Sequence, residues 1–336
     1  MSTLRVGEAL LPSIAYGDAM GLPVEAKSAS EIAHRYGMID RLIPPQDNPY
    51  YSENLPVGTT SDDTQLSIAV AEALMAADGF DIDAQAAEHL RIYQQTAKTK
   101  KPNGDWLVRG WGGSTTNAMG RLAAGISPYE SGQAEGAGNG IVMKMAPLVY
   151  WQASRGTDET TRSVQYDQLT TMTHDSDIAR ACTRLHGEIL HWLLAHPGVT
   201  IPEFQSEVLR VVAKEPRADP KQRIERAVRV PLSTLSQLIT RYTNGLTNGH
   251  YGFFVPNTIA MAYDVFMASR ADYTTTVTNA ANLGGDADSI ASIAGAMANA
   301  WSGGDFERPL DFRATQNHEA LAELSREFAK KALQLV

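Results

Sequence analysis

The chain of 336 residues is 43% hydrophobic and 20% charged, so it can bury a large core and is not a disordered sequence. Its formal net charge of −9 argues against a nucleic-acid backbone as the main partner, because phosphate binding needs a basic surface. One small phosphorylated ligand stays possible, since a cation or a helix N-terminus can meet its charge. The single cysteine, Cys182, excludes an internal disulfide and a cysteine-based zinc site. With no signal peptide or membrane span apparent in the sequence, we expect a soluble cytoplasmic protein.

Helical patterns cover most of the chain. Apolar spacing predicts a first helix over residues 6–20, with a kink or an early break at Pro12. Ser28 and Glu31 form a capping box that begins a short helix reaching Tyr36. Further helices are predicted over residues 62–74, 84–96, 114–122, 141–146, 173–194, 201–213, 231–242, 256–267, 273–281, 290–297 and 318–335.

The segments between these helices read as loops. Residues 43–51 are rich in proline and predict a surface loop, and residues 98–113 are polar and glycine-rich. Residues 214–221 are charged and hold two prolines, which indicates a solvated connector. Residues 228–234 are the one strand candidate, and Pro231 weakens it. Because no βαβ alternation or internal repeat is present, the sequence predicts one all-α domain over residues 1–336.

Two distant helices begin with the same kind of acidic sequence. Ser61-Asp62-Asp63-Thr64 precedes one apolar stripe, and Gly284-Gly285-Asp286-Ala287-Asp288-Ser289 precedes another. Small residues in both helices would let them pack closely and bring the acidic ends together. Four crowded carboxylates repel one another unless they are protonated or hold cations. Hard oxygen donors without cysteine or histidine favour Mg²⁺, Mn²⁺ or Ca²⁺ over zinc or copper.

Ordinary helix capping is the alternative for these acids. Aspartate and serine are favoured N-cap residues, and acids near a helix start are stabilised by its dipole. One acidic helix start alone would be explained best in this way. Two copies, each with two carboxylates and a hydroxyl, favour a shared metal site.

Two glycine-rich turns suggest an anionic ligand. Residues 110–116 and 136–140 both precede helices, so backbone N–H groups would face an anion, although glycine before a helix is also ordinary turn chemistry. Glu25 follows a sharp turn and is either a general base, a carboxylate near a metal or a surface residue. His174, near a helix start, is more often a capping or solvated residue than a ligand. Trp111 and Phe253 could stack on a base, but aromatic residues are usually core residues.

Taken together, these stretches resemble the ADP-ribosylglycohydrolase family, the group of the dinitrogen-reductase-activating glycohydrolases and the ADP-ribosyl-arginine hydrolases. The matching stretches occur in the family's order and span roughly residues 7–300. They are residues 17–25 (GDAMGLPVE), 61–64 (SDDT), 110–114 (GWGGS), 138–148 (GNGIVMKMAPL), 173–174 (TH) and 284–289 (GGDADS).

The resemblance implies a compact, orthogonal helical bundle with a cleft that holds two divalent cations, Mg²⁺ or Mn²⁺. It implies metal ligation by Ser61, Asp62, Asp63, Asp286, Asp288 and Ser289. Glu25, Asp62 and Asp288 would be catalytic. The substrate would be held by Gly110, Gly112, Gly113, Ser114, Gly136, Gly138, Asn139, Gly140 and His174.

The implied activity is hydrolysis of the bond between ADP-ribose and a protein side chain, most often arginine. Two alternatives stay open: an immunity-type protein that binds an ADP-ribosyltransferase toxin, and a hydrolase of another linkage (serine, acetyl ester or nucleic acid). The chain departs from the family pattern at three positions. Ser61 and Ser289 stand where threonine is common and keep the hydroxyl, whereas Lys144 replaces an arginine fork by a point charge.

Overall fold

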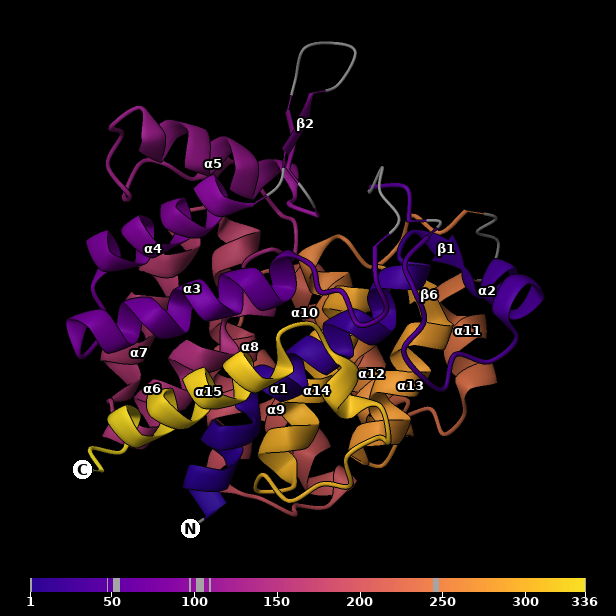
Figure 1. Cartoon of the computed structure of the whole chain (residues 1–336). Helices are drawn as coiled ribbons and strands as arrows, with labels where there is room; N and C mark the ends of the chain where they lie inside the picture. Colours follow the sequence, from indigo (N-terminus) through magenta and orange to yellow (C-terminus); the bar gives the residue numbers. More distant parts are fainter. Residues whose placement is uncertain are drawn as a thin grey trace.

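The computed structural model describes residues 2–46, 48–50, 55–96, 98–100, 106–108, 110–243 and 248–335. Helices dominate this part of the chain (Figure 1). In chain order they are α1 (Ser2–Gly21), α2 (Ala29–Tyr36), α3 (Asp62–Ala77), α4 (Ile82–Gln95), α5 (Gly113–Ala123), α6 (Ala146–Arg155), α7 (Glu159–Thr171), α8 (Asp177–Ala195), α9 (Ile201–Ala213), α10 (Ala218–Arg229), α11 (Leu235–Thr243), α12 (Val255–Ala268), α13 (Tyr273–Leu283), α14 (Ala287–Trp301) and α15 (His318–Ala332).

Short strands and 3-10 helices join these helices. The strands are β1 (Lys27–Ser28), β2 (Lys98–Lys100), β3 (Trp106–Val108), β4 (Gln133–Ala134), β5 (His174–Asp175) and β6 (Gly284–Gly285). β1 pairs with β6 and β2 with β3 in antiparallel fashion, and β4 pairs with β5 in parallel. The 3-10 helices are η1 (Leu22–Val24), η2 (Val142–Lys144) and η3 (Phe312–Ala314). The all-α prediction is confirmed, because these strands are only two or three residues long.

Helix α1 lies at the centre of the bundle, with α14 and α15 against it (Figure 1). Most of its residues are buried, from Val6 to Gly21. The helix passes through Pro12 without the predicted break. Burial on several sides outweighs the loss of one backbone hydrogen bond at the proline.

One hydrophobic cluster runs from Val6 to Ala332 and includes residues of α1, α8, α12 and α14. This continuity favours the prediction of a single domain. Among the described residues, no helix combines the length and apolar character needed to cross a bilayer.

Several local predictions were wrong. The segment predicted as a solvated connector contains the start of α10, because Pro220 lies in the first turn, where its missing N–H costs little. Val228 ends the buried face of α10, so the strand candidate does not form. Residues 142–144 form a 3-10 helix rather than an α-helix. Helix α7 and the β2–β3 hairpin, which projects from the body beside α5, were not predicted (Figure 1).

Candidate active site at two acidic helix starts

Glycines in α1 allow its C-terminal end to lie directly against the start of α14. A β-carbon at Gly17 would be 2.5 Å from the carbonyl oxygen of Ala291. At Gly21 it would be 2.2 Å from the amide nitrogen of Asp288. Real β-carbons do not approach backbone atoms this closely, so this contact requires glycine. The close approach fixes the acidic start of α14 beside the end of α1.

Helix α3 is capped by residues other than its own first-turn acids. The Ser61 hydroxyl accepts a hydrogen bond from the amide of Asp63 at 3.2 Å. The fully buried Asp18, from α1, accepts hydrogen bonds from the amides of Ser61 (2.8 Å) and Thr64 (3.2 Å). Since Ser61 and Asp18 supply the cap, capping does not explain why Asp62 and Asp63 line the neighbouring cavity.

The two acidic helix starts meet. The Ser289 hydroxyl on α14 donates to Asp63 Oδ2 on α3 at 3.3 Å. Asn139 Nδ2 donates to Asp286 Oδ2 at 2.5 Å, which joins the second glycine-rich turn to α14. Asp63 Oδ1 and Asp288 Oδ1 are buried and have no hydrogen-bond partner among the described residues. Two buried carboxylate oxygens are therefore available for a ligand.

Backbone pairing brings Glu25 to the same place. The Ala26 amide donates to the Gly285 carbonyl at 2.8 Å, next to the β1–β6 pair. Carboxylate oxygens of Glu25, Asp286 and Asp288 consequently lie within 4.8 Å of one another. Asn48 Nδ2 donates to Glu25 Oε2 at 2.9 Å and fixes the orientation of that carboxylate.

Burial dominates the electrostatics of this cluster. It raises the pKa of Glu25, Asp62, Asp63 and Asp286, and the charge on Asp288 raises each of them further. The same two causes raise the pKa of Asp18 to about 7. Crowded, buried carboxyl groups must bind protons or cations. Oxygen donors with two unpartnered atoms fit a hard divalent cation such as Mg²⁺ or Mn²⁺.

A cavity of about 380 Å³ opens in front of the acids. The first glycine-rich turn forms one wall, at the N-terminus of α5. Nothing lies within 4 Å of the positions that β-carbons would take at Gly112 and Gly113. Packing within the described chain therefore does not require glycine at these two positions. The free space lies over a helix N-terminus, where backbone N–H groups attract an anion.

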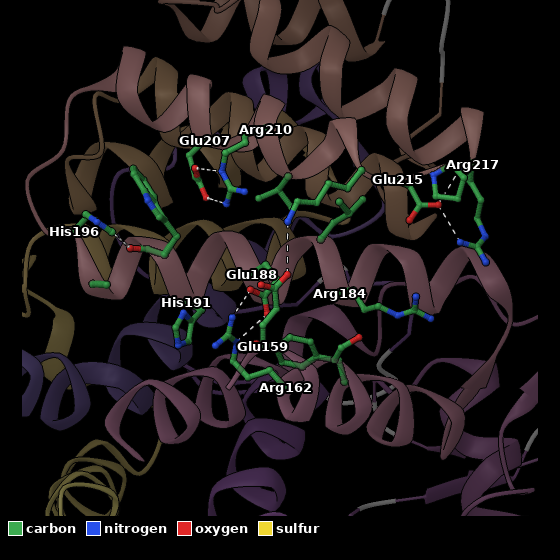
Figure 2. A pocket seen from close by; sticks show the side chains of 18 residues that line it. Glu159, Arg162, Arg184, Glu188, His191, His196, Glu207, Arg210, Glu215 and Arg217 are labelled. Atoms are coloured by element: carbon green, nitrogen blue, oxygen red, sulfur yellow. Dashed lines mark hydrogen bonds and ion pairs between the residues drawn. The ribbon is translucent and has the colours of Figure 1, made fainter. Parts of the chain in front are cut away.

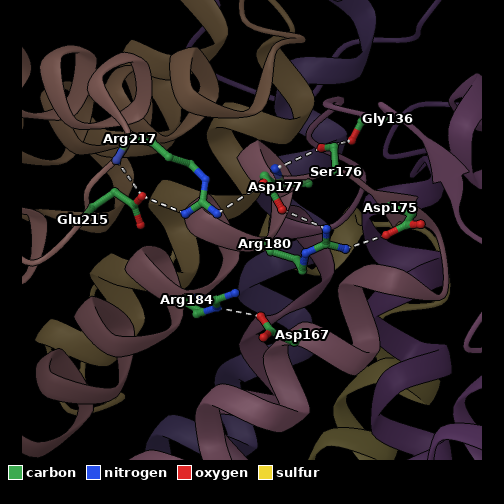
Figure 3. Close-up of polar contacts among 10 residues, drawn as sticks. Gly136, Asp167, Asp175, Ser176, Asp177, Arg180, Arg184, Glu215 and Arg217 are labelled. Carbon is green, nitrogen blue, oxygen red and sulfur yellow. Dashed lines mark hydrogen bonds and ion pairs between the residues drawn. The ribbon is translucent and has the colours of Figure 1, made fainter.

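The second glycine-rich turn is held by backbone contacts from other elements. The Asn139 amide donates to the Phe253 carbonyl at 3.1 Å, which places Phe253 in the cavity wall. The Ser176 hydroxyl, at the start of α8, donates to the Gly136 carbonyl at 2.6 Å (Figure 3). Beside this bond, Arg180 pairs with Asp175 at 2.5 Å. Hydrogen bonds from Ser176 and to Phe253 thus fix the position of the second glycine-rich turn.

His174 supports this turn as a neutral side chain. Its ring is buried and its Nδ1 lies 2.9 Å from the Thr173 hydroxyl. Burial, helped by the charge on Lys144, lowers the pKa of His174 to about 3. A β-carbon at Gly140 would lie 3.2 Å from His174 Cε1, so the ring fills the space behind the turn. His174 is uncharged at neutral pH and does not cap α8, whose cap is Ser176.

Nearly all of the predicted site residues line this one cavity. Ser61 and Gly136 lie behind it, and both are engaged in the hydrogen bonds described above. The lining residues from the prediction are Glu25, Asp62, Asp63, Gly110, Gly112, Gly113, Ser114, Gly138, Asn139, Gly140, His174, Asp286, Asp288 and Ser289.

Sequence reasoning missed several residues here. Tyr50, Thr115 and Met143 line the cavity, and Asn48 holds Glu25. Asn48 and Tyr50 come from the proline-rich loop, which carries no periodic signal. Trp111 and Phe253, considered as stacking or core residues, are both in the cavity wall.

One known protein family covers nearly the whole chain. A model of the ADP-ribosylglycohydrolase family matches residues 5–334. The chain belongs to the ADP-ribosylglycohydrolase family.

Two relatives and one solved structure are similar to this chain at 23–26% identity. An uncharacterized protein of Archaeoglobus fulgidus is 25% identical over 333 residues, covering 96% of this chain and 95% of that protein. The ADP-ribosylarginine hydrolase Tri1 of Pseudomonas putida is 26% identical over 254 residues, which cover 74% of this chain and 60% of Tri1. A solved structure, described as an ADP-ribosylglycohydrolase-related protein complex, aligns with a TM-score of 0.68 and 23% identity over 99% of this chain and 98% of that chain. This likeness shows the shared fold.

Proposed function

We propose that this chain hydrolyses the bond between ADP-ribose and a modified protein side chain, with arginine as the first candidate. The observation that carries the proposal is the meeting of the acidic starts of α3 and α14 in front of a glycine-lined cavity. The similarity to Tri1, an ADP-ribosylarginine hydrolase, supports arginine as the linkage. The cavity supports a ligand that carries both a sugar and phosphates, because hydroxyl-binding acids and anion-binding turns line the same space.

Two Mg²⁺ or Mn²⁺ ions would be held by Asp62, Asp63, Asp286, Asp288 and Ser289, whose oxygens face the cavity. When bound, such ions polarise the ribose hydroxyls and lower the pKa of a water molecule. Ser61, the remaining ligand predicted from the sequence, does not line the cavity, and its hydroxyl donates to Asp63 instead.

The residues of the chain would orient the substrate and move protons. Glu25 is fixed by Asn48, and burial, with the charge on Asp288, raises its pKa. It is therefore our candidate for the acid that gives a departing guanidine its proton. The amides of the two glycine-rich turns would hold the diphosphate. His174, being neutral, would support the second turn rather than donate a charge.

The test is release of free ADP-ribose from a panel of ADP-ribosylated substrates linked through arginine, serine, acetyl ester or nucleic acid. We expect release from the arginine substrate with Mg²⁺ or Mn²⁺, none in EDTA, and a loss of roughly 100-fold or more in Asp62→Ala. Asp83→Ala is the matched control, since Asp83 is an exposed acid in the first turn of α4.

Undiminished activity in EDTA would contradict the metal-dependent proposal. Release from a different member of the panel would replace arginine by that linkage. Protection of cells from a transferase by Asp62→Ala would instead point to a protein that acts by binding the toxin.

A further inference from the structure

A second cavity of about 500 Å³ lies between α7, α8, α9 and the segment that follows α9 (Figure 2). It shares no lining residue with the cavity in front of the acids of α3 and α14, which we call the cleft. We name it the α8 groove. Apolar atoms dominate its surface, and the apolar residues that line it are Tyr166, Leu185, Trp192, Ala195, Val211 and Pro216.

Two carboxylates of the groove, Glu188 and Glu207, already have hydrogen-bond partners. Glu188 accepts hydrogen bonds from two nitrogens of Arg162, at 2.9 and 2.5 Å. Glu207 accepts two from Arg210, at 2.7 and 2.5 Å. The side chains of Glu188 and Glu207 are only 23% and 11% exposed. These acids therefore offer little attraction to a cationic ligand.

The cations, in contrast, are exposed and keep unused donors. Arg210, in the last turn of α9, and Lys214, its C-cap residue, have side chains that are 57% and 62% exposed. Among the described residues, Arg210 leaves one terminal nitrogen without a partner. Lys214 has only an ion pair at 3.6 Å, to Glu159, whose side chain is 71% exposed (Figure 2). Exposed pairs of this kind contribute little, so an incoming anion can recruit both cations.

A flat apolar surface lies on the facing helix. The half-buried Trp192 of α8 lines the groove, and the ring of His196 stacks on it with centroids 4.6 Å apart. The fully buried ring of Tyr166 lies in the wall beneath this surface. An apolar surface and an exposed pair of cations match a ligand with an apolar body and an anionic end.

We propose that the α8 groove binds a small organic anion, with a flat apolar body against Trp192 and a phosphate, sulfonate or carboxylate group held by Arg210 and Lys214. The paired acids exclude cations from the site, and the apolar wall selects against inorganic anions. This second binding site is separate from the proposed catalytic cleft, and its existence does not depend on the reaction carried out there.

The test is calorimetric titration of the full chain with 1-naphthyl phosphate in EDTA, so that no divalent cation attracts the phosphate to the cleft. We expect one site per chain and weaker binding of both fragments, 1-naphthol and inorganic phosphate. Arg210→Gln and Lys214→Gln should each weaken binding about tenfold, because each removes a charge-assisted hydrogen bond. Arg326→Gln is the matched control, since Arg326 makes the same exposed i,i+3 pair on α15, outside both cavities.

Three results would overturn the proposal: no binding at millimolar concentration, equal binding of 1-naphthol, or equal affinity in Arg210→Gln and Arg326→Gln. Loss of binding in Gly112→Ala, together with full binding in Arg210→Gln, would assign the naphthyl phosphate to the cleft instead and would also overturn it. The melting temperature of each variant is measured alongside, so that a folding defect is separated from a loss of affinity.

Discussion

At the scale of single residues, the buried acids near the cavity fall into two groups: those whose oxygens accept backbone hydrogen bonds and those that keep an oxygen without a partner. Asp18 accepts hydrogen bonds from the start of α3, whereas Asp63 and Asp288 each keep one oxygen without a partner among the described residues. The sequence places all three in similar small-residue surroundings. Only the structure shows that Asp18 does the capping and frees Asp62 for the cavity, because the capping bonds cross from α1 to α3.

Gly112 tests the proposed substrate cavity directly. Its φ and ψ of −63° and 153° suit alanine, and nothing lies within 4 Å of the added carbon. We therefore expect Gly112→Ala to fold normally, with a free energy of unfolding unchanged or raised by up to about 1 kcal/mol. Its methyl group would point into space that the ligand needs and raise KM roughly tenfold, measured by release of ADP-ribose.

Gly120→Ala, in α5, is the control, since its β-carbon also meets nothing within 4 Å but Gly120 lies outside the cavity lining. An unchanged KM in Gly112→Ala would show that this turn does not contact the substrate.

At the scale of secondary structure, the contact between α1 and α14 should link stability to activity. In Gly21→Ala the new carbon would meet backbone atoms of Ala287 and Asp288, which cannot move aside cheaply. We expect a loss of about 1–3 kcal/mol in the free energy of unfolding. We also expect a fall in activity larger than in Gly120→Ala, because α14 carries two of the proposed metal ligands on its first turn. Denaturant titration and ADP-ribose release measure the two effects. A free energy of unfolding in Gly21→Ala equal to that of the wild type would contradict the close contact between α1 and α14.

The contact between α8 and α12 should make stability depend on pH. His186 of α8 is buried, with Nδ1 3.2 Å from the hydroxyl of Tyr263, and burial lowers its pKa to about 4. Between about pH 6.5 and 4 His186 binds a proton in the unfolded chain but not in the folded chain, so the free energy of unfolding decreases as the pH falls.

We expect the wild type to lose about 2 kcal/mol more than His186→Gln between pH 7.5 and pH 5, measured by denaturant unfolding at both pH values. Other titrating groups are common to both proteins and cancel in the difference. Equal losses would show that His186 is charged in the folded state.

Helices with a clear apolar period and a local cap were predictable. Residues 201–213 and the capping box of α2 are found as expected, because their signals lie within a few residues of one another. Helices α7 and α10 were missed because they are polar or begin near proline, and burial against α8 and α12 stabilises them. The pairing of β1 with β6 joins residues far apart in the chain, so no local pattern could indicate it.

At the scale of the whole molecule, buried acids should make the effect of a divalent cation depend on pH. Burial raises the pKa of the carboxyl groups that line the cavity, Asp62, Asp63 and Asp286, above their unfolded values. Without metal, the folded chain therefore holds protons that the unfolded chain has released, and its stability falls as the pH rises from the unfolded toward the folded pKa of these groups. A cation displaces those protons, so the stabilisation that it provides should grow with pH.

We expect the rise in melting temperature with excess Mg²⁺ over EDTA to be larger at pH 8 than at pH 5.5, with NaCl of equal ionic strength as the control. The stabilisation reaches about 2.7 kcal/mol at one hundred times the dissociation constant. If the rise in melting temperature with Mg²⁺ is the same at both pH values, the buried acids hold no proton in the absence of metal.

The acidic stretches predicted the composition of the site, because each motif is continuous in sequence. The sequence did not reveal Asn48 and Tyr50, since only the folded chain brings their loop over Glu25. It did not reveal the α8 groove either, whose walls come from separate helices that carry ordinary surface charges.

The central position of α1 has a consequence for how the protein is made. Its amide at Leu11 donates to Ser325, 314 residues away, and Asn299 donates to the carbonyl of Val6. At the usual rate of translation, these partners leave the ribosomal exit tunnel on the order of half a minute after α1 has been made. During that interval its apolar faces are uncovered. We expect folding after release to be slowed by the long loop that must close before α1 meets these partners.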